Sequence, residues 1–150
     1  MTQKKIIVAL DSDNFKNAIS LVNNLKKDVY AFKIGYEFFL NFGINGYKSI
    51  QQKNVKIFLD LKLHDIPNSV KSGIDAITKL NPYFTTIHIS GGDEMQEAAV
   101  SVKKNTKIIG VSILTSLDSS QTKKYNYNDN IENIVSDYTH YALKNKLDGV

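Results

Sequence analysis

Ile57-Phe58-Leu59-Asp60-Leu61-Lys62-Leu63-His64-Asp65-Ile66-Pro67 is an apolar run that ends in two carboxylates with a lysine between them. Its first part is typical of a buried strand. Residues i and i+2 of a strand share a face, so Asp60 and Lys62 should point the same way. Asp65 follows in a loop, and Pro67 predicts the first turn of a helix. Because unpaired charge in an interior costs several kcal/mol per ion, these three groups must pair or serve a function.

The rest of the chain alternates between strand-like and helix-like patterns. Short runs rich in β-branched residues predict strands at 5–10, 30–34, 55–61, 85–90 and 107–114, with a sixth that begins at 148–150. Between them, apolar residues recur at spacings of three and four, which predicts helices over 15–25, 38–50, 67–80, 93–103 and 131–143. This order predicts parallel strands joined by right-handed helical crossovers.

Polar residues near the ends of successive predicted strands favour a barrel over an open sheet. They are Asp11, Lys33, Asp60 with Lys62, His88 and Thr115. Barrels of the (β/α)₈ type build their sites from such strand ends. No Gly-x-Gly-x-x-Gly motif follows the first strand, which argues against a doubly wound dinucleotide fold. We therefore predict an α/β fold of the (β/α)₈ TIM-barrel class.

The length covers only part of such a barrel. A (β/α)₈ barrel has eight units and typically about 250 residues, whereas these 150 residues hold five units and the start of a sixth. An open parallel sheet would also leave strand edges unpaired. We therefore expect residues 1–150 to be the N-terminal portion of a single barrel domain, with the remaining strands outside them.

Composition predicts an ordinary soluble protein. The chain is 42% hydrophobic and 23% charged, and no apolar run approaches the ~18 residues that a membrane span requires. All 19 basic residues are lysines scattered along the chain, whereas nucleic-acid surfaces concentrate positive charge on one face. There is no cysteine and no signal-peptide pattern. We expect a cytoplasmic protein that binds neither membranes nor nucleic acids.

The spacing Asp60-x-Lys62-x-x-Asp65 has a chemical interpretation and a structural one. Two carboxylates stabilise the ammonium form of the lysine between them, which suits it to donate a proton rather than to form a Schiff base. They also repel a substrate carboxylate, and loss of CO₂ would relieve that repulsion. The lysine could then protonate the carbanion, without a metal or organic cofactor. The alternative is a structural ion-pair cluster at the barrel mouth.

Segments along the whole chain resemble the orotidine 5′-phosphate decarboxylase family, which converts orotidine 5′-phosphate to uridine 5′-phosphate in pyrimidine biosynthesis. The most specific segment is Phe58 to Pro67. The others arrive in the family's order: Val8-Ala9-Leu10-Asp11, Phe32-Lys33-Ile34-Gly35 with Glu37-Phe38-Phe39, His88 with Gly91-Gly92, and Leu114-Thr115-Ser116. The resemblance implies a nucleotide substrate and a decarboxylation that uses no metal and no cofactor.

By this resemblance, Lys62 is the proton donor to C6 of the pyrimidine, and Asp60 and Asp65 flank the departing carboxylate. In the family the second aspartate comes from the neighbouring subunit, which implies a homodimer with shared active sites. Ile66 would accompany Asp65 across that interface.

The resemblance also implies the remaining contacts with the substrate. Asp11 and Lys33 would bind the ribose hydroxyls and complete the charged network around Asp60, and Thr115 would contact the pyrimidine. The family holds the substrate's phosphate on later strands, outside the present residues.

Structural alternatives and two rival functions stay open. Asp11 could cap the first helix, His88 could be a core residue as readily as a ligand contact, and we expect His64 to be structural. Relatives that act on sugar phosphates share the Asp-x-Lys-x-x-Asp spacing but use Mg²⁺. Lys33 argues against a cation there, and sensitivity to EDTA would favour them. The second rival is a catalytically silent barrel. Lys62→Ala should lower the stability of such a barrel, whereas in an enzyme it should lower turnover and leave the fold intact.

Overall fold

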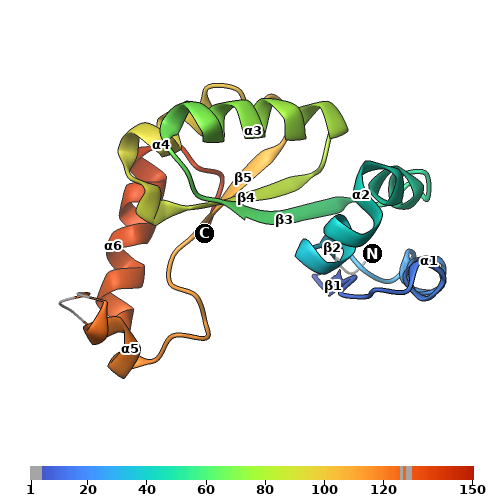
Figure 1. Cartoon of the computed structure of the whole chain (residues 1–150), viewed down its shortest axis with the longest axis horizontal. Coiled ribbons are helices and arrows are strands. Elements are labelled where there is room, and N and C mark those ends of the chain that lie inside the picture. The colour runs from blue at the N-terminus through green and yellow to red at the C-terminus, as the bar shows by residue number, and fades with distance from the viewer. Residues whose placement is uncertain (1–4, 126, 128–129) are drawn as a thin grey trace.

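The computed structural model describes residues 5–125, 127 and 130–150, and it shows a parallel sheet whose strands alternate with helices (Figure 1). Five strands follow the chain order β1-β2-β3-β4-β5, each pairing in parallel with the next. The elements are β1 (Ile7–Ala9), α1 (Phe15–Leu25), β2 (Ala31–Ile34), α2 (Tyr36–Gln51), β3 (Ile57–Leu63), α3 (Pro67–Leu80), β4 (Phe84–His88), the 3₁₀ turn η1 (Ile89–Gly91), α4 (Asp93–Val100), β5 (Lys107–Val111), α5 (Ser119–Lys124) and α6 (Ile131–Lys144).

The predicted order of elements is confirmed, and the differences lie mainly at their ends. β3 continues to Leu63, beyond the predicted end at 61. β5 stops at Val111 instead of 114, and α4 stops at Val100 instead of 103. The predicted sixth strand is a single parallel bridge between Ile109 and Gly149. Element type is therefore set by the periodic patterns, and element length by the neighbours.

Two helices differ in form from the prediction. The sequence analysis predicts no helix at α5, because this segment has no apolar period. It begins where the Asp118 side chain accepts hydrogen bonds from the backbone N–H groups of Ser120 and Gln121. α2 is interrupted at Gly43, which has a φ of 56° and a ψ of −152°. Glycine reaches this conformation without the Cβ clash that other residues would meet.

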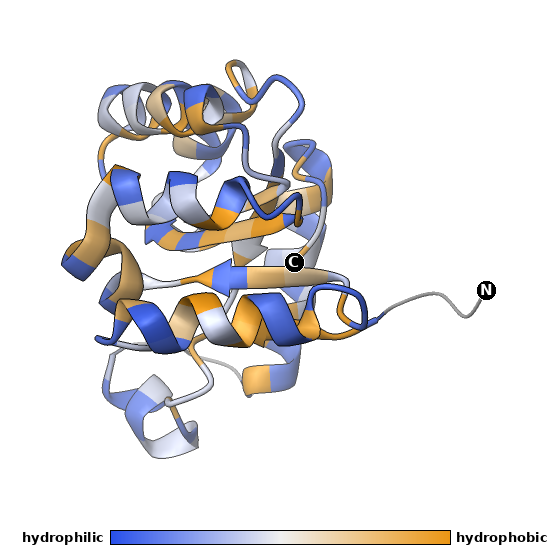
Figure 2. Ribbon diagram, turned by 90° about the vertical axis from the view of Figure 1, so that its right-hand side faces the viewer, coloured by the Kyte–Doolittle hydropathy of each residue, from blue (hydrophilic) through white to orange (hydrophobic). Residues whose placement is uncertain are grey.

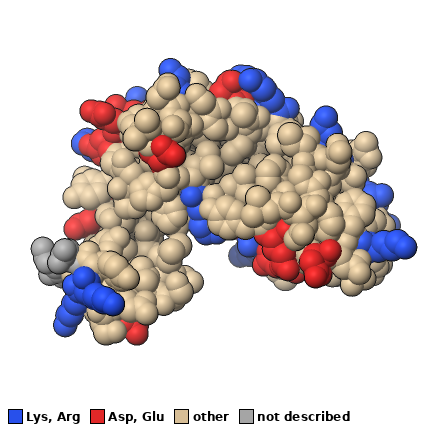
Figure 3. Space-filling model, viewed as in Figure 1, with Lys and Arg blue, Asp and Glu red and all other residues tan. Residues whose placement is uncertain are grey.

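The two faces of the sheet have different surroundings. One set of alternate strand residues faces the helices and joins a continuous apolar core; Phe32, Leu59 and Ile87 are completely buried in it. The other set includes Phe58 and Phe84, which are only half-buried. Figure 1 shows α3 and α4 together over one face, and Figure 3 shows the molecule hollowed on the opposite side. The site described below lies on this second face.

The hydropathy of the strands differs from that of the helices. In Figure 2 the strands are largely orange and the helices are banded in orange and blue, which is the pattern of amphipathic helices packed on a buried sheet. Within the part of the chain that the structure describes, no helix is both long and apolar enough to cross a lipid bilayer.

Candidate active site

An irregular pairing between β3 and β4 creates the centre of the site. Leu59 pairs with Thr85 and Leu63 pairs with Ile87, so three consecutive residues of β3 lie opposite the single residue Thr86 of β4. Such a bulge bends a strand and redirects its side chains. Asp60 and Lys62 do point the same way, as predicted, but β3 reaches this arrangement through the bulge and not through regular alternation.

The bulge places Asp60 and Lys62 together through Thr86. Lys62 has a left-handed backbone, with φ of 44°, and its backbone N–H donates to the Thr86 hydroxyl oxygen at 2.8 Å. The Thr86 hydroxyl in turn donates to Oδ1 of Asp60 at 2.9 Å. Sequence reasoning missed Thr86, because a threonine in a β-branched run has the pattern of any strand residue.

Four predicted site residues form one charged network on β2, on β3 and just after β1. Oδ2 of Asp60 lies 2.8 Å from Nζ of Lys62 and 3.5 Å from Nζ of Lys33. Nζ of Lys33 lies 3.7 Å from Oδ1 of Asp11. Lys33 thus bridges a buried carboxylate to the surface, since the Asp60 side chain is 8% exposed and that of Asp11 is 53% exposed.

The first helix does not use Asp11 as its cap. α1 is capped by Asn14, whose side chain accepts from the backbone N–H of Asn17, so the capping alternative for Asp11 is wrong. Gly35 leaves room for the network: a Cβ there would lie 3.3 Å from Oδ1 of Asp11 and 3.6 Å from Nζ of Lys33. A side chain at this position would crowd the Asp11 carboxylate and would touch the Lys33 ammonium group.

The network keeps Asp60 ionised. Burial raises the pKa of this carboxyl, but the hydrogen bonds from Lys62 and Thr86 and the charges of Lys62 and Lys33 outweigh it, so the pKa lies below its usual value. His88, at the end of β4, has a lowered pKa because burial and the neighbouring His64 and Lys62 disfavour its cation. The site therefore combines a fixed carboxylate with a neutral imidazole.

The two histidines form a stacked pair beside the network. The rings of His64 and His88 are 5.1 Å apart with an interplanar angle of 25°. Gly91 lies close to His64: a Cβ there would lie 3.3 Å from the His64 ring. His88 is half-buried and His64 is exposed. Among the described residues, no group of three or more His, Cys, Asp and Glu side chains is placed to hold a metal ion.

The remaining predicted residues lie apart from the network. Asp65 and Ile66 are exposed in the β3–α3 loop, where Oδ1 of Asp65 accepts the backbone N–H of Ile66 at 2.6 Å. Within the described part of the chain, Asp65 makes no ion pair with Lys62. Thr115 is exposed in the loop after β5. One copy of the chain therefore gathers Asp11, Lys33, Asp60 and Lys62, and leaves the other three residues at its surface.

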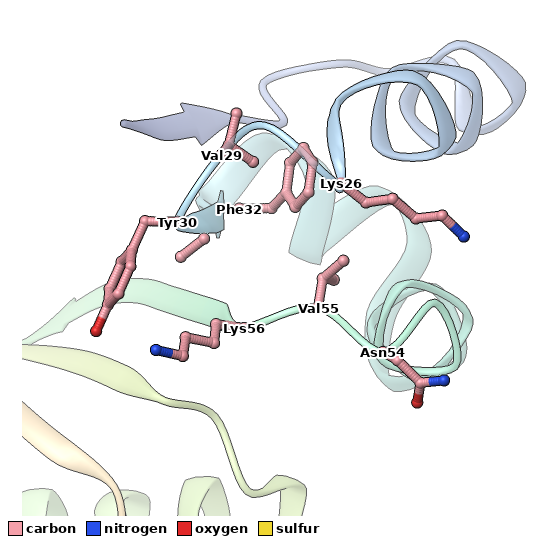
Figure 4. A pocket seen from close by; sticks show the side chains of 8 residues that line it. Lys26, Val29, Tyr30, Phe32, Asn54, Val55 and Lys56 are labelled. Atoms are coloured by element: carbon pink, nitrogen blue, oxygen red, sulfur yellow. The ribbon is translucent and has the colours of Figure 1, made fainter. Parts of the chain in front are cut away.

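A pocket of about 230 Å³ lies at the opposite, amino end of the strands (Figure 4). Phe32 and Val55 border its middle, Tyr30 and Lys56 extend to one side of it, and Lys26 extends to the other. Barrels of this class carry out chemistry at the carboxyl ends of their strands. We therefore place the candidate site at the charged network and not at this pocket.

Comparisons with known proteins identify the family of the chain. The sequence model of the family described as orotidine 5′-phosphate decarboxylase / HUMPS matches residues 4–150. An orotidine 5′-phosphate decarboxylase of Wolbachia sp. subsp. Brugia malayi (strain TRS) is 42% identical over 147 residues, which cover 97% of this chain and 65% of that protein. One of Ehrlichia chaffeensis (strain ATCC CRL-10679 / Arkansas) is 44% identical over 131 residues, which cover 86% of this chain and 57% of that protein.

A solved structure shows the same fold. The crystal structure of orotidine 5′-phosphate decarboxylase from Lactobacillus acidophilus superposes with a TM-score of 0.89 at 34% identity, covering 99% of this chain and 70% of that one. The predicted (β/α)₈ class is confirmed, with five β/α units of the barrel in the present sheet. The chain spans less than two thirds of the length of the two curated relatives above.

Proposed function

This chain belongs to the orotidine 5′-phosphate decarboxylase / HUMPS family, and we propose that it catalyses the decarboxylation of orotidine 5′-phosphate to uridine 5′-phosphate in pyrimidine biosynthesis. The observation that carries the proposal is the Asp60–Lys62 pair, joined at 2.8 Å and linked to Lys33 and, through it, to Asp11. The pair lies at the carboxyl end of a parallel strand, where barrel enzymes hold their substrates. The proposed reaction uses neither a metal nor an organic cofactor.

The proposed chemistry divides between the two members of the pair. The bond between C6 of the pyrimidine and its carboxylate breaks, CO₂ leaves, and the electron pair stays on C6. The Lys62 ammonium then donates the proton that forms the C6–H bond and later regains one from solvent. Asp60 repels the substrate carboxylate before the reaction, and its hydrogen bond to Nζ of Lys62 favours the charged lysine.

The other predicted contacts complete the proposal. Lys33 and Asp11 would hold the ribose hydroxyls, which is supported by their partial exposure beside Asp60. Thr115, exposed in the loop after β5, would contact the pyrimidine. The ligand is then a small nucleotide and not a nucleic acid, and we place the protein in the cytoplasm, a location in keeping with a chain that has no cysteine.

We propose that a second copy of the chain completes each site. Asp65 is exposed and its carboxylate turns to the N–H of Ile66, so it is free to face a partner. Ile66 is 67% exposed at the same loop, and exposed apolar side chains that cluster favour an interface. In the homodimer, Asp65 of one copy would flank the substrate carboxylate in the site of the other.

Helix α2 offers apolar surface for the same dimer. Tyr36 and Leu40, one turn apart on one side of the helix, are 52% and 78% exposed. The Tyr36 hydroxyl donates to the carbonyl of Leu61 at 2.6 Å. This hydrogen bond ties the surface to the strand that carries Lys62, so packing of a second copy there would act directly on the site.

The direct test is decarboxylation of orotidine 5′-phosphate by the full-length protein in the presence of EDTA, followed as loss of substrate absorbance. We expect turnover that EDTA does not reduce. Absence of turnover at high enzyme concentration would refute the proposal, and turnover that EDTA abolishes would favour the Mg²⁺-dependent relatives.

Sharing of sites is tested by mixing two inactive variants. Lys62→Ala and Asp65→Asn should each be inactive alone. In a mixed dimer one of the two sites regains both native residues, so the mixture should recover up to about a quarter of wild-type activity, because half of the dimers are mixed. No recovery, with dimers shown by sedimentation, would place both residues in a single copy's site.

A further inference from the structure

We propose that Thr86 is a positioning residue that holds Asp60 and Lys62 in the geometry for proton transfer. The inference rests on the proposed function, because it assigns a role within the same site. Thr86 belongs to a different strand from the pair and is 3% exposed, so it acts on the substrate only through Asp60 and Lys62.

The single hydroxyl of Thr86 replaces the backbone partner that the bulge removes. Three residues of β3 face this one residue of β4, so a regular ladder cannot satisfy the backbone N–H of Lys62. The Thr86 oxygen accepts that N–H at 2.8 Å. The contact holds the left-handed backbone of Lys62, which determines where its ammonium lies.

The same hydroxyl fixes the orientation of the carboxylate. It donates to Oδ1 of Asp60 at 2.9 Å, while Oδ2 faces the ammonium groups of Lys62 and Lys33 at 2.8 and 3.5 Å. One oxygen is therefore anchored by the neighbouring strand and the other by the cations. Without the first anchor the carboxylate plane could rotate, and the distance to Lys62 would vary.

Only a side chain that both donates and accepts can make these two contacts at once. Valine has the same shape but would leave a backbone N–H and a carboxylate oxygen without partners in a partly buried site, which is costly. Serine keeps the hydroxyl. Thr85 provides a matched control, because it is the adjacent threonine, is fully buried, and donates only to the carbonyl of Leu59 at 2.9 Å.

The experiment compares full-length Thr86→Val, Thr86→Ser and Thr85→Val. We expect Thr86→Val to lower kcat by roughly 10- to 100-fold, as for a lost pair of buried hydrogen bonds, with KM nearly unchanged. Thr86→Ser should retain most of the activity, and Thr85→Val should keep kcat even if it unfolds at lower urea. A kcat within about twofold of wild type in Thr86→Val, or equal losses in Val and Ser variants, would overturn the proposal.

A pH profile separates positioning from general support of the fold. The Thr86 hydrogen bond is one of the causes that lower the pKa of Asp60, which faces Lys62, Lys33 and, more distantly, His88. Its loss should move the acidic limb of the kcat profile to higher pH in Thr86→Val and not in Thr85→Val. Unmoved limbs in both variants would contradict the assignment.

Hydrogen exchange keeps the inference distinguishable from the proposed function. The Lys62 amide should exchange at least about tenfold faster in Thr86→Val than in wild type or Thr85→Val, because it loses its acceptor. If wild type does not decarboxylate orotidine 5′-phosphate but this difference appears, the proposed function fails and the positioning of Lys62 stands. If the amide exchanges equally in all three proteins, the positioning fails.

Discussion

Two pairs of lysines lie at opposite ends of the same sheet and have different neighbours. At the carboxyl end, Lys33 and Lys62 both meet the buried carboxylate of Asp60. At the amino end, Lys56 and Lys107 lie over tyrosine rings. The residue type is the same, but only the first pair has a buried carboxylate as its partner, and a carboxylate can position a lysine ammonium group as a proton donor. The neighbours of a lysine therefore determine its chemistry.

The amino end is organised as a packing cluster. Nζ of Lys56 is 4.0 Å from the ring centre of Tyr30 and 4.3 Å from that of Tyr83, and the two tyrosine hydroxyls are hydrogen-bonded at 2.9 Å. The Phe84 ring packs against Tyr83 at 4.6 Å and against Phe58 at 5.6 Å. Aromatic and cation–π contacts of this kind stabilise a fold without supplying a reactive group.

The largest expected difference between the two ends comes from removing one lysine at each. Lys62→Ala should lower kcat by about 10³-fold or more, because the proton donor is lost. Lys56→Ala, six residues earlier and at the opposite end of β3, should keep kcat within about twofold. Steady-state rates and urea unfolding measure both effects. Equal losses of turnover in the two variants would contradict the difference between the two ends. A Lys62→Ala protein that loses stability but keeps turnover would show that the charged network supports the fold and not the reaction.

The next largest difference between the two ends is expected in how the free energy of unfolding changes with pH in acid. The folded pKa of Asp60 lies below its ordinary value of 3.8, so its ionised form stabilises the fold above the unfolded pKa, and this is lost as pH falls through the folded pKa. Asp60→Asn should therefore cost about 1–3 kcal/mol at pH 7 and progressively less below pH 4.

The control for this prediction lies at the amino end. Tyr30→Phe alters groups that do not titrate in acid, so its effect on the free energy of unfolding should stay constant from pH 7 to pH 3. An Asp60→Asn difference that is equally constant would show that the Asp60 charge contributes nothing to stability.

A smaller effect is expected from the aromatic cluster itself. Phe84→Leu keeps an apolar side chain but loses the ring contacts with Tyr83 and Phe58, which should lower the free energy of unfolding by about 1 kcal/mol. Because the change lies at the amino end, kcat should be unaffected. A fall in kcat larger than the fall in stability would mean that the two ends are coupled through β4.

The smallest effect is expected from Tyr30→Phe. It removes one partly buried hydrogen bond to the Tyr83 hydroxyl, which water can partly replace. Its loss of stability in urea unfolding should be below that of Phe84→Leu, and its kcat should equal that of wild type. A larger loss than in Phe84→Leu would give the hydroxyl pair, not the ring packing, the main role at this end.

Much of the fold could be predicted because the local spacing of apolar residues indicates which segments are strands and which are helices. Apolar runs and three- and four-residue spacings located all five strands, and polar residues predicted at the ends of β1, β2 and β3 meet in the charged network. α5 has no such periodicity and forms through a cap at Asp118, so it was not predicted. The second face of the sheet, with its half-buried Phe58 and Phe84, was not predicted either. Its exposure depends on how the strands assemble and not on any local sequence pattern.

The sequence singled out the four residues that meet in the charged network, but not the geometry that brings them together. Asp60 and Lys62 do meet, yet through a bulge that depends on the register between two strands and not on alternation within one. The role of Thr86 follows from that register alone. Asp65 lies in the predicted loop without contacting Lys62 in the same copy, and the interpretation of this separation depends on a second chain.

At Lys62 the stability of the fold and the proposed activity make opposite demands on one residue, because its backbone is left-handed. A non-glycine residue in this region costs about 1–2 kcal/mol, so glycine would suit the φ of 44° better than lysine does. A search that ranks substitutions by stability alone would favour replacing it and would remove the ammonium group. Under the proposed function, the strained backbone is a cost in stability that comes with placing the proton donor at this residue, and stabilising substitutions should begin at the amino end of the sheet.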